Sequence, residues 1–115
     1  MRVLAAIILF AVYLAEPPVS LRLMPSFGFA PLAVRLTIRV PPHADNRVVC
    51  IQIDSDNGYF RSSCFEHIGE KAKGLIVQVY QRLEVGNYLV IVDLARINNK
   101  HYQASQTFRA IGEEN

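Results

Sequence analysis

The segment 83–94 constrains the fold more than any other part of the chain. It reads Leu-Glu-Val-Gly-Asn-Tyr and continues directly into Leu-Val-Ile-Val-Asp-Leu. A leucine at Leu83, a glycine three residues later at Gly86 and a tyrosine two beyond it at Tyr88 are typical of the corner through which a β-sandwich enters a late strand. The segment therefore predicts an antiparallel β-sandwich.

The first fifteen residues predict the compartment. Arg2 is followed by thirteen uncharged, mostly apolar residues, 3–15. This length suits a secretory signal and falls short of the roughly 20 residues that cross a bilayer as a helix. We therefore expect residues 1–15 to be a signal peptide and the protein to be exported to the periplasm, the cell surface or the medium. A cut after Ala15 would place the bulky Tyr13 where a small residue is preferred, so an uncleaved membrane anchor is the alternative.

The remaining length fits one domain. Residues 16–31 contain four of the six prolines and are expected to form a linker or a lead-in strand. Residues 32–115 are then expected to form the β-sandwich domain. The formal net charge of the whole chain is only +2, and no basic run is interleaved with aromatic residues, so no nucleic-acid partner is expected.

Alternating hydrophobicity predicts the other strands. Apolar and polar residues alternate over 34–40, and Pro41-Pro42 ends this strand because a proline donates no ladder hydrogen bond. With no helical period after the leader, the pattern indicates six to seven strands, and a small closed barrel is the alternative. Later strands are expected over 47–54, 59–65, 75–79, 88–94 and 102–108. One of them is expected to present an apolar face made of Leu75, Val77 and Val79.

The order of these segments resembles the immunoglobulin-like and fibronectin type III-like modules of bacterial exported proteins. The resemblance covers residues 32–111 and rests on Leu83, Gly86 and Tyr88, whereas Val85 stands where such modules often have a proline. It implies an immunoglobulin-like sandwich with these three residues as its structural corner. It also implies an interaction or structural module whose partner is another envelope or extracellular protein.

The two cysteines flank a turn. Cys50 and Cys64 are equally distant from Asn57, so a three-residue loop over 56–58 would place them directly opposite each other on paired strands. This geometry favours a disulfide in an oxidising compartment. A two-residue loop would instead pair Ile51 with Cys64, which leaves two separate buried thiols as the alternative. A catalytic Cys64 assisted by His67 would require both thiols to be reduced.

A ligand-binding function is the main alternative to a protein-interaction function. The hairpin loop carries acidic and aromatic groups that could bind calcium or a carbohydrate, namely Asp54, Asp56, Asn57 and Tyr59. Such a site would need the turns at 43–46, 55–59 and 98–100 to converge at one end. The carboxylates are scattered and the three histidines lie in separate segments, so no enzyme, metal or cofactor is expected and the histidines are expected in solvated loops.

Overall fold

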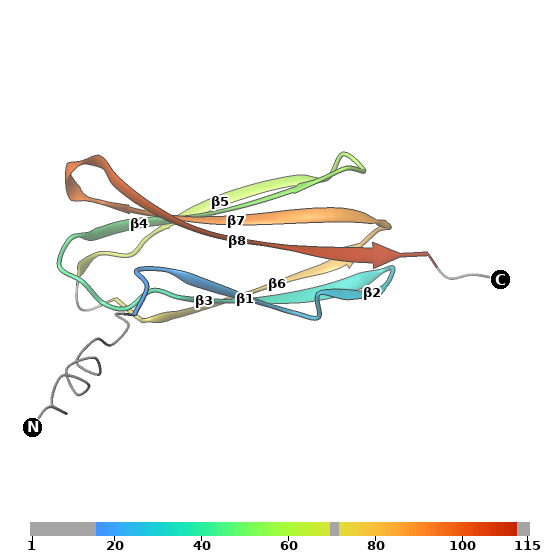
Figure 1. Cartoon of the computed structure of the whole chain (residues 1–115), viewed down its shortest axis with the longest axis horizontal. Helices are drawn as coiled ribbons and strands as arrows, with labels where there is room; N and C mark the ends of the chain where they lie inside the picture. Colours follow the sequence, from blue (N-terminus) through green and yellow to red (C-terminus); the bar gives the residue numbers. More distant parts are fainter. Residues whose placement is uncertain (1–15, 70–71, 113–115) are drawn as a thin grey trace, which may run out of the picture.

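The computed structural model describes residues 16–69 and 72–112, which form a two-layered β-sandwich (Figure 1). The region expected to be a signal peptide or anchor, residues 1–15, lies outside the described residues. Within the described part of the chain, no helix is long and apolar enough to cross a membrane. The strands are β1 (Ser20–Met24), β2 (Phe27–Phe29), β3 (Leu32–Arg39), β4 (Asn46–Ser55), β5 (Phe60–Glu66), β6 (Leu75–Leu83), β7 (Gly86–Arg96) and β8 (Lys100–Ile111).

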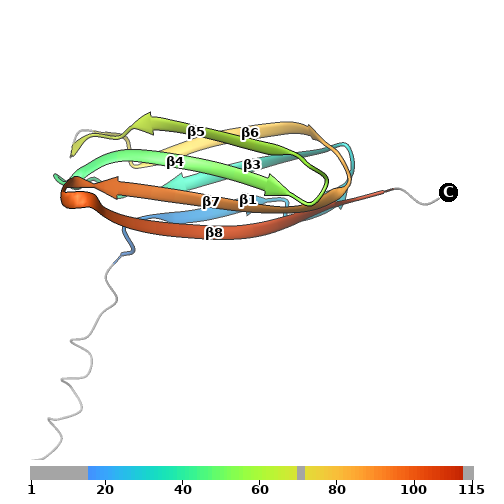
Figure 2. The ribbon, with the colours of Figure 1, turned by 90° about the horizontal axis from the view of Figure 1, so that it is seen from above.

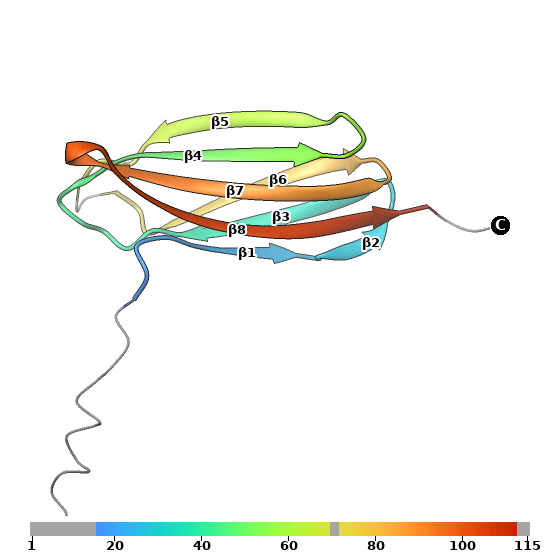
Figure 3. The same ribbon diagram turned by 45° about the horizontal axis from the view of Figure 1, so that its top comes forward.

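The strands divide into a three-stranded sheet, in the order β1-β3-β6, and a five-stranded sheet, in the order β2-β8-β7-β4-β5. The prediction of an all-β sandwich is confirmed. Eight strands form rather than six or seven, because residues 16–31 contribute two short ones. β1 pairs with β3 antiparallel and β2 pairs with β8 in parallel, so this segment passes from one sheet to the other (Figure 3).

The core lies between the sheets and follows the alternation along each strand. In β3, Leu36 and Ile38 are fully buried while Arg35 and Arg39 point outward. β7 buries a second apolar row against them, made of Tyr88, Val90, Val92 and Leu94. Removing these side chains from water is the main favourable term in folding a domain of this size.

The β4–β5 hairpin has the three-residue loop 56–58. The Ser55 amide donates to the Tyr59 carbonyl at 3.0 Å, and Gly58 has a φ of 95°, which favours glycine. Cys50 therefore faces Cys64 across the two strands. The same register places the buried Ile53 opposite Arg61, whose guanidinium lies over the ring of Tyr80 on β6 at 5.6 Å from its centroid. An arginine is tolerated on the inner face because β5 is an edge strand, where the guanidinium can reach past the core.

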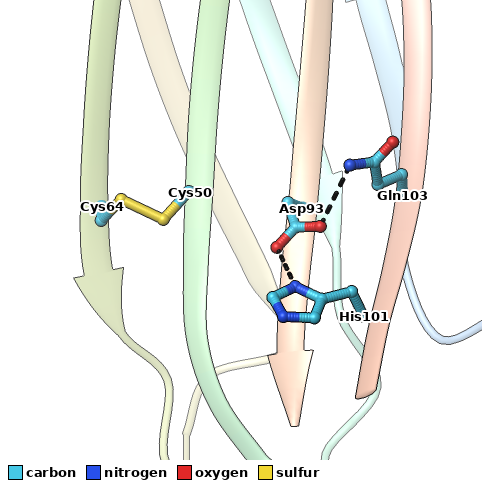
Figure 4. Close-up of a disulfide and its surroundings, with 5 residues drawn as sticks. All are labelled: Cys50, Cys64, Asp93, His101 and Gln103. Carbon is cyan, nitrogen blue, oxygen red and sulfur yellow. Dashed lines mark hydrogen bonds and ion pairs between the residues drawn. A yellow bond between two sulfur atoms is a disulfide. The ribbon is translucent and has the colours of Figure 1, made fainter. Parts of the chain in front are cut away.

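The predicted disulfide is confirmed. Cys50 and Cys64 are bonded, with their Cα atoms 4.0 Å apart. Figure 4 shows the bond on the face that also carries Asp93, which is the outer face of the five-stranded sheet. The alternatives of two separate thiols and of a reactive Cys64 are both wrong, because neither cysteine is free.

The corner before β7 is held by the Tyr88 hydroxyl. It donates to the Glu84 carbonyl at 2.6 Å, as in the tyrosine corner of immunoglobulin-like domains. Its ring stacks on Phe108 with the centroids 4.6 Å apart. Leu83 is buried beside it, and a Cβ at Gly86 would stand 2.8 Å from the Asn57 side-chain nitrogen, so a larger residue there would displace the Asn57 side chain.

We expect Tyr88→Phe to lower the free energy of unfolding by about 1–3 kcal/mol, because it leaves the Glu84 carbonyl without its donor and removes one of the two acceptors of the Asn57 side-chain amide. The measurement is chemical denaturation of the disulfide-intact protein. Tyr102→Phe is the matched control, since no hydrogen bond of its hydroxyl is found within residues 16–69 and 72–112. An equal loss in both variants would show that the corner bond adds nothing to stability.

Candidate functional site

The four residues of the predicted ligand loop contact two parts of the sandwich. Asp54 and Asp56 border the outer face of the five-stranded sheet, and Asn57 and Tyr59 turn toward the corner. Asp56 also contacts the corner, because its carboxylate accepts from Asn87. The Asn57 amide donates to the Tyr88 hydroxyl at 3.0 Å and to the Val85 carbonyl at 2.9 Å. The Tyr59 ring meets the Tyr88 ring edge-on at 5.9 Å. The structure therefore uses Asn57 and Tyr59 to hold the hairpin against the corner.

Asp54 and Asp56 border an open depression of about 700 Å³ at this end of the sheet. Other polar side chains around it are Ser26, Ser55, Asn87, Thr107 and Arg109. Leu89 supplies an apolar patch between them and is 39% exposed. Such a surface offers a carboxylate acceptor, a guanidinium donor and hydroxyl groups to a small polar ligand. The ligand-binding alternative stays a prediction, now confined to this depression.

Asp56 is fixed by Asn87. One carboxylate oxygen accepts from the Asn87 amide N–H at 3.0 Å and the other from the Asn87 side chain at 2.8 Å. These bonds, first the backbone one and then the side-chain one, hold the pKa of Asp56 below its ordinary value, and the positive charge of Arg109 adds to the effect. The carboxylate therefore stays ionised to a lower pH than an ordinary aspartate does.

The three turns that a ligand site at one end would need do not converge. The turn at 97–99 lies beside the loop before β4, where the Ile97 amide donates to the Asp45 carbonyl at 3.0 Å and Arg96 donates to Asn46 at 2.9 Å. The turn at 55–59 lies at the opposite end of the sheet (Figures 1 and 3). The reason is topological, since β4 runs the length of the sandwich between the first loop and the second.

The three histidines lie apart, and two are not in solvated loops as expected. His67 is buried, with Nε2 at 2.6 Å from the Lys73 carbonyl. His101 lies on β8 with Nδ1 at 2.8 Å from Asp93, which also accepts from Gln103 at 3.2 Å (Figure 4). Across residues 16–69 and 72–112, no three side chains among His, Cys, Asp and Glu gather closely enough to hold a metal ion.

The face of β6 is the opposite of the one expected. Leu75, Val77 and Val79 point outward and are 52%, 44% and 52% exposed, while Ile76 and Tyr80 turn toward the core. The inward face carries the polar Gln78 between Ile76 and Tyr80, so alternation alone favours the wrong side of the strand. The row Leu75-Val77-Val79, called here the β6 row, is an exposed apolar strip beside a free strand edge.

The edges of the two sheets differ in their protection. β5 carries Arg61 and Glu66, β2 has only three residues, and the Leu21 carbonyl of β1 accepts from Gln106 of the opposing sheet at 2.7 Å. β6 has no charge, proline or glycine over 75–81. Protective features appear only at its end, where Arg82 has a φ of 59° and the pairing with β3 is irregular. Within the described residues, β6 is therefore the least protected edge.

Comparison with known proteins gives a fold but no family. No family model matches the chain, and no curated protein matches it. A superoxide reductase (neelaredoxin) from Ignicoccus hospitalis is similar in structure, with a TM-score of 0.63 and 10% identity over 80% of this chain and 79% of that one. A variant of that reductase gives 0.64 and 12% identity over 95% and 90%. The CARDB domain of a Pyrococcus furiosus protein, in complex with di-metal ions, gives 0.52 and 8% over 89% and 100%.

These neighbours correct the expectation that the protein is not an enzyme. That expectation rested on the scattered carboxylates and the separated histidines, yet several structures similar to this chain are superoxide reductases. A fold hosts unrelated functions, and identities of 10–12% show the fold alone. The resemblance to exported immunoglobulin-like modules is confirmed only as an all-β sandwich.

We expect Asp56 to titrate below the ordinary carboxyl value of about 3.9. Because its folded-state pKa is lowered, its contribution to stability is present above the unfolded-state pKa and is lost as the pH falls through the folded-state pKa. Asn87→Ala should raise the pKa of Asp56 toward the ordinary value while the backbone bond remains. Carbon-detected NMR titration of both proteins measures this, and an Asp56 pKa at or above the ordinary value in the native protein contradicts it.

Proposed function

We propose that this protein is an exported interaction module that meets another polypeptide chain of the envelope or extracellular space at the β6 edge. The observation that carries the proposal is the β6 row, three exposed aliphatic side chains on an uncharged edge strand. Exposed apolar residues and free backbone groups on one strand are the combination that binds an added strand.

The edge offers two kinds of contact to an added strand. Regular pairing of β6 with β3 extends from Leu75 to Tyr80, so the backbone on the other side of this stretch is extended and free to pair. The β6 row would lie beside alternate side chains of the added strand, which can provide specificity. Arg61 of β5 lies over Tyr80, so the inner side of the edge is already covered.

Export is the second part of the proposal. A disulfide on the outer face of a sheet persists in an oxidising compartment, and reducing cytosol would open it. Residues 1–15 have the length and polarity of a secretory signal. Together these features support export, and with it the proposal that the β6 edge meets envelope or extracellular proteins.

We expect protein recovered from an exporting host to have lost its leader and to take up two alkylating groups only after reduction, because both cysteines are bonded. Intact mass with and without reduction measures both properties. A retained leader together with two alkylations before reduction would overturn the export proposal.

We expect a photo-reactive benzoylphenylalanine at Val77 to cross-link the protein to another chain in the exporting host. Ser105 is the matched control, since it is also exposed and lies on a strand, but on the five-stranded sheet. Denaturing gel electrophoresis and mass spectrometry then compare the products. No adduct at Val77, or equal adducts at both positions, would overturn the proposed function.

A further inference from the structure

We propose that the chain which pairs with the β6 edge is a second copy of this protein, forming a symmetric antiparallel dimer centred on Val77. The inference rests on the proposed function and adds the identity of the partner. Its basis is the self-complementary order of side chains along β6.

Antiparallel pairing about Val77 matches the β6 row with itself. Val77 then faces Val77 of the second copy, and Leu75 faces Val79 on either side. A shift of the centre to Ile76 would place Val79 opposite Lys73, and a shift to Gln78 would place Leu75 opposite Gln81. Because cross-strand pairs of aliphatic side chains stabilise a sheet, only the register centred on Val77 pairs all three.

Charge also favours a second copy. No charged residue lies over 75–81, so the paired stretches of β6 bring no like charges of their own together. In the proposed register the flanking cations Lys73 and Arg82 come opposite Gln81 and Ala72 rather than opposite each other. The nearby arginines Arg35 and Arg39 lie one strand away on β3, and Arg39 is already paired with Glu16. A second copy therefore needs no acidic partner surface.

The shape of the sandwich limits the assembly to two copies. β5 and β6 border the same long side, as Figure 2 shows and as Arg61 over Tyr80 requires, so two copies would meet along one side. In a two-fold symmetric dimer both copies bury this same side, so no free β6 edge remains to bind a third copy. The depression near Asp54 and the outer face of the five-stranded sheet remain accessible.

The test is sedimentation equilibrium of the disulfide-intact protein over a concentration series. We expect a dimer for the native chain. Val77→Lys and Val77→Glu should each raise the dimer dissociation constant by roughly tenfold or more, because each variant places like charges opposite each other. An equimolar mixture of the two should form a heterodimer. Leu89→Lys is the matched control, since it charges an exposed aliphatic residue on the other sheet and should leave the dimer intact.

Cysteine cross-linking tests the register. Val77→Cys should form a disulfide-linked dimer on mild oxidation, whereas Val79→Cys should not, because it faces Leu75. A preserved Cys50–Cys64 bond and a native circular dichroism spectrum show that each variant is folded.

Three results would overturn the inference: a native monomer at all concentrations, a dimer unchanged by either charge at Val77, or a Val79→Cys cross-link as efficient as that of Val77→Cys. The first result leaves the proposed function intact if the photo-reactive Val77 captures a chain of different mass. Without any such adduct, the proposed function falls as well.

Discussion

The Tyr88 hydroxyl joins three segments on which the rest of the sandwich depends. It donates to the Glu84 carbonyl and accepts from Asn57, so it connects the turn before β7 to the tip of the β4–β5 hairpin. Its ring lies between Tyr59 and Phe108 in the core. A buried hydroxyl that lost these partners would carry an unpaid desolvation cost, so the network fixes the position of the hairpin as well as the corner.

This network also decides which groups remain available for binding. Asn57 and Tyr59 are occupied at the corner, so they no longer belong to a loop that could close around a calcium ion or a sugar. Asp54 and Asp56 remain on the outer face, beside Arg109. Two separate surfaces therefore remain as candidates for binding: the polar depression beside Asp54 and Asp56, and the apolar edge at β6.

Some features could be predicted because they depend on neighbours in sequence or on simple symmetry. Cys50 and Cys64 are equally spaced about Asn57, so the hairpin loop alone sets their register. The outward face of β6 could not be predicted, since Leu75 and Ile76 are both apolar and lie on opposite faces. Only the packing of Ile76 and Tyr80 against the core decides which face is buried. The position of the three turns likewise depends on strand length and order, which spacing in the sequence does not reveal.

The amino-acid sequence by itself determined the strand alternation and the corner at Leu83, Gly86 and Tyr88, because each follows from local geometry over a few residues. It also determined the pairing of the two cysteines once the hairpin loop is known to have three residues. Only the tertiary structure decided which strands became edges and which apolar face stayed in solvent. These properties arise from contacts between residues far apart in the chain, such as Leu21 with Gln106, and no local pattern encodes them.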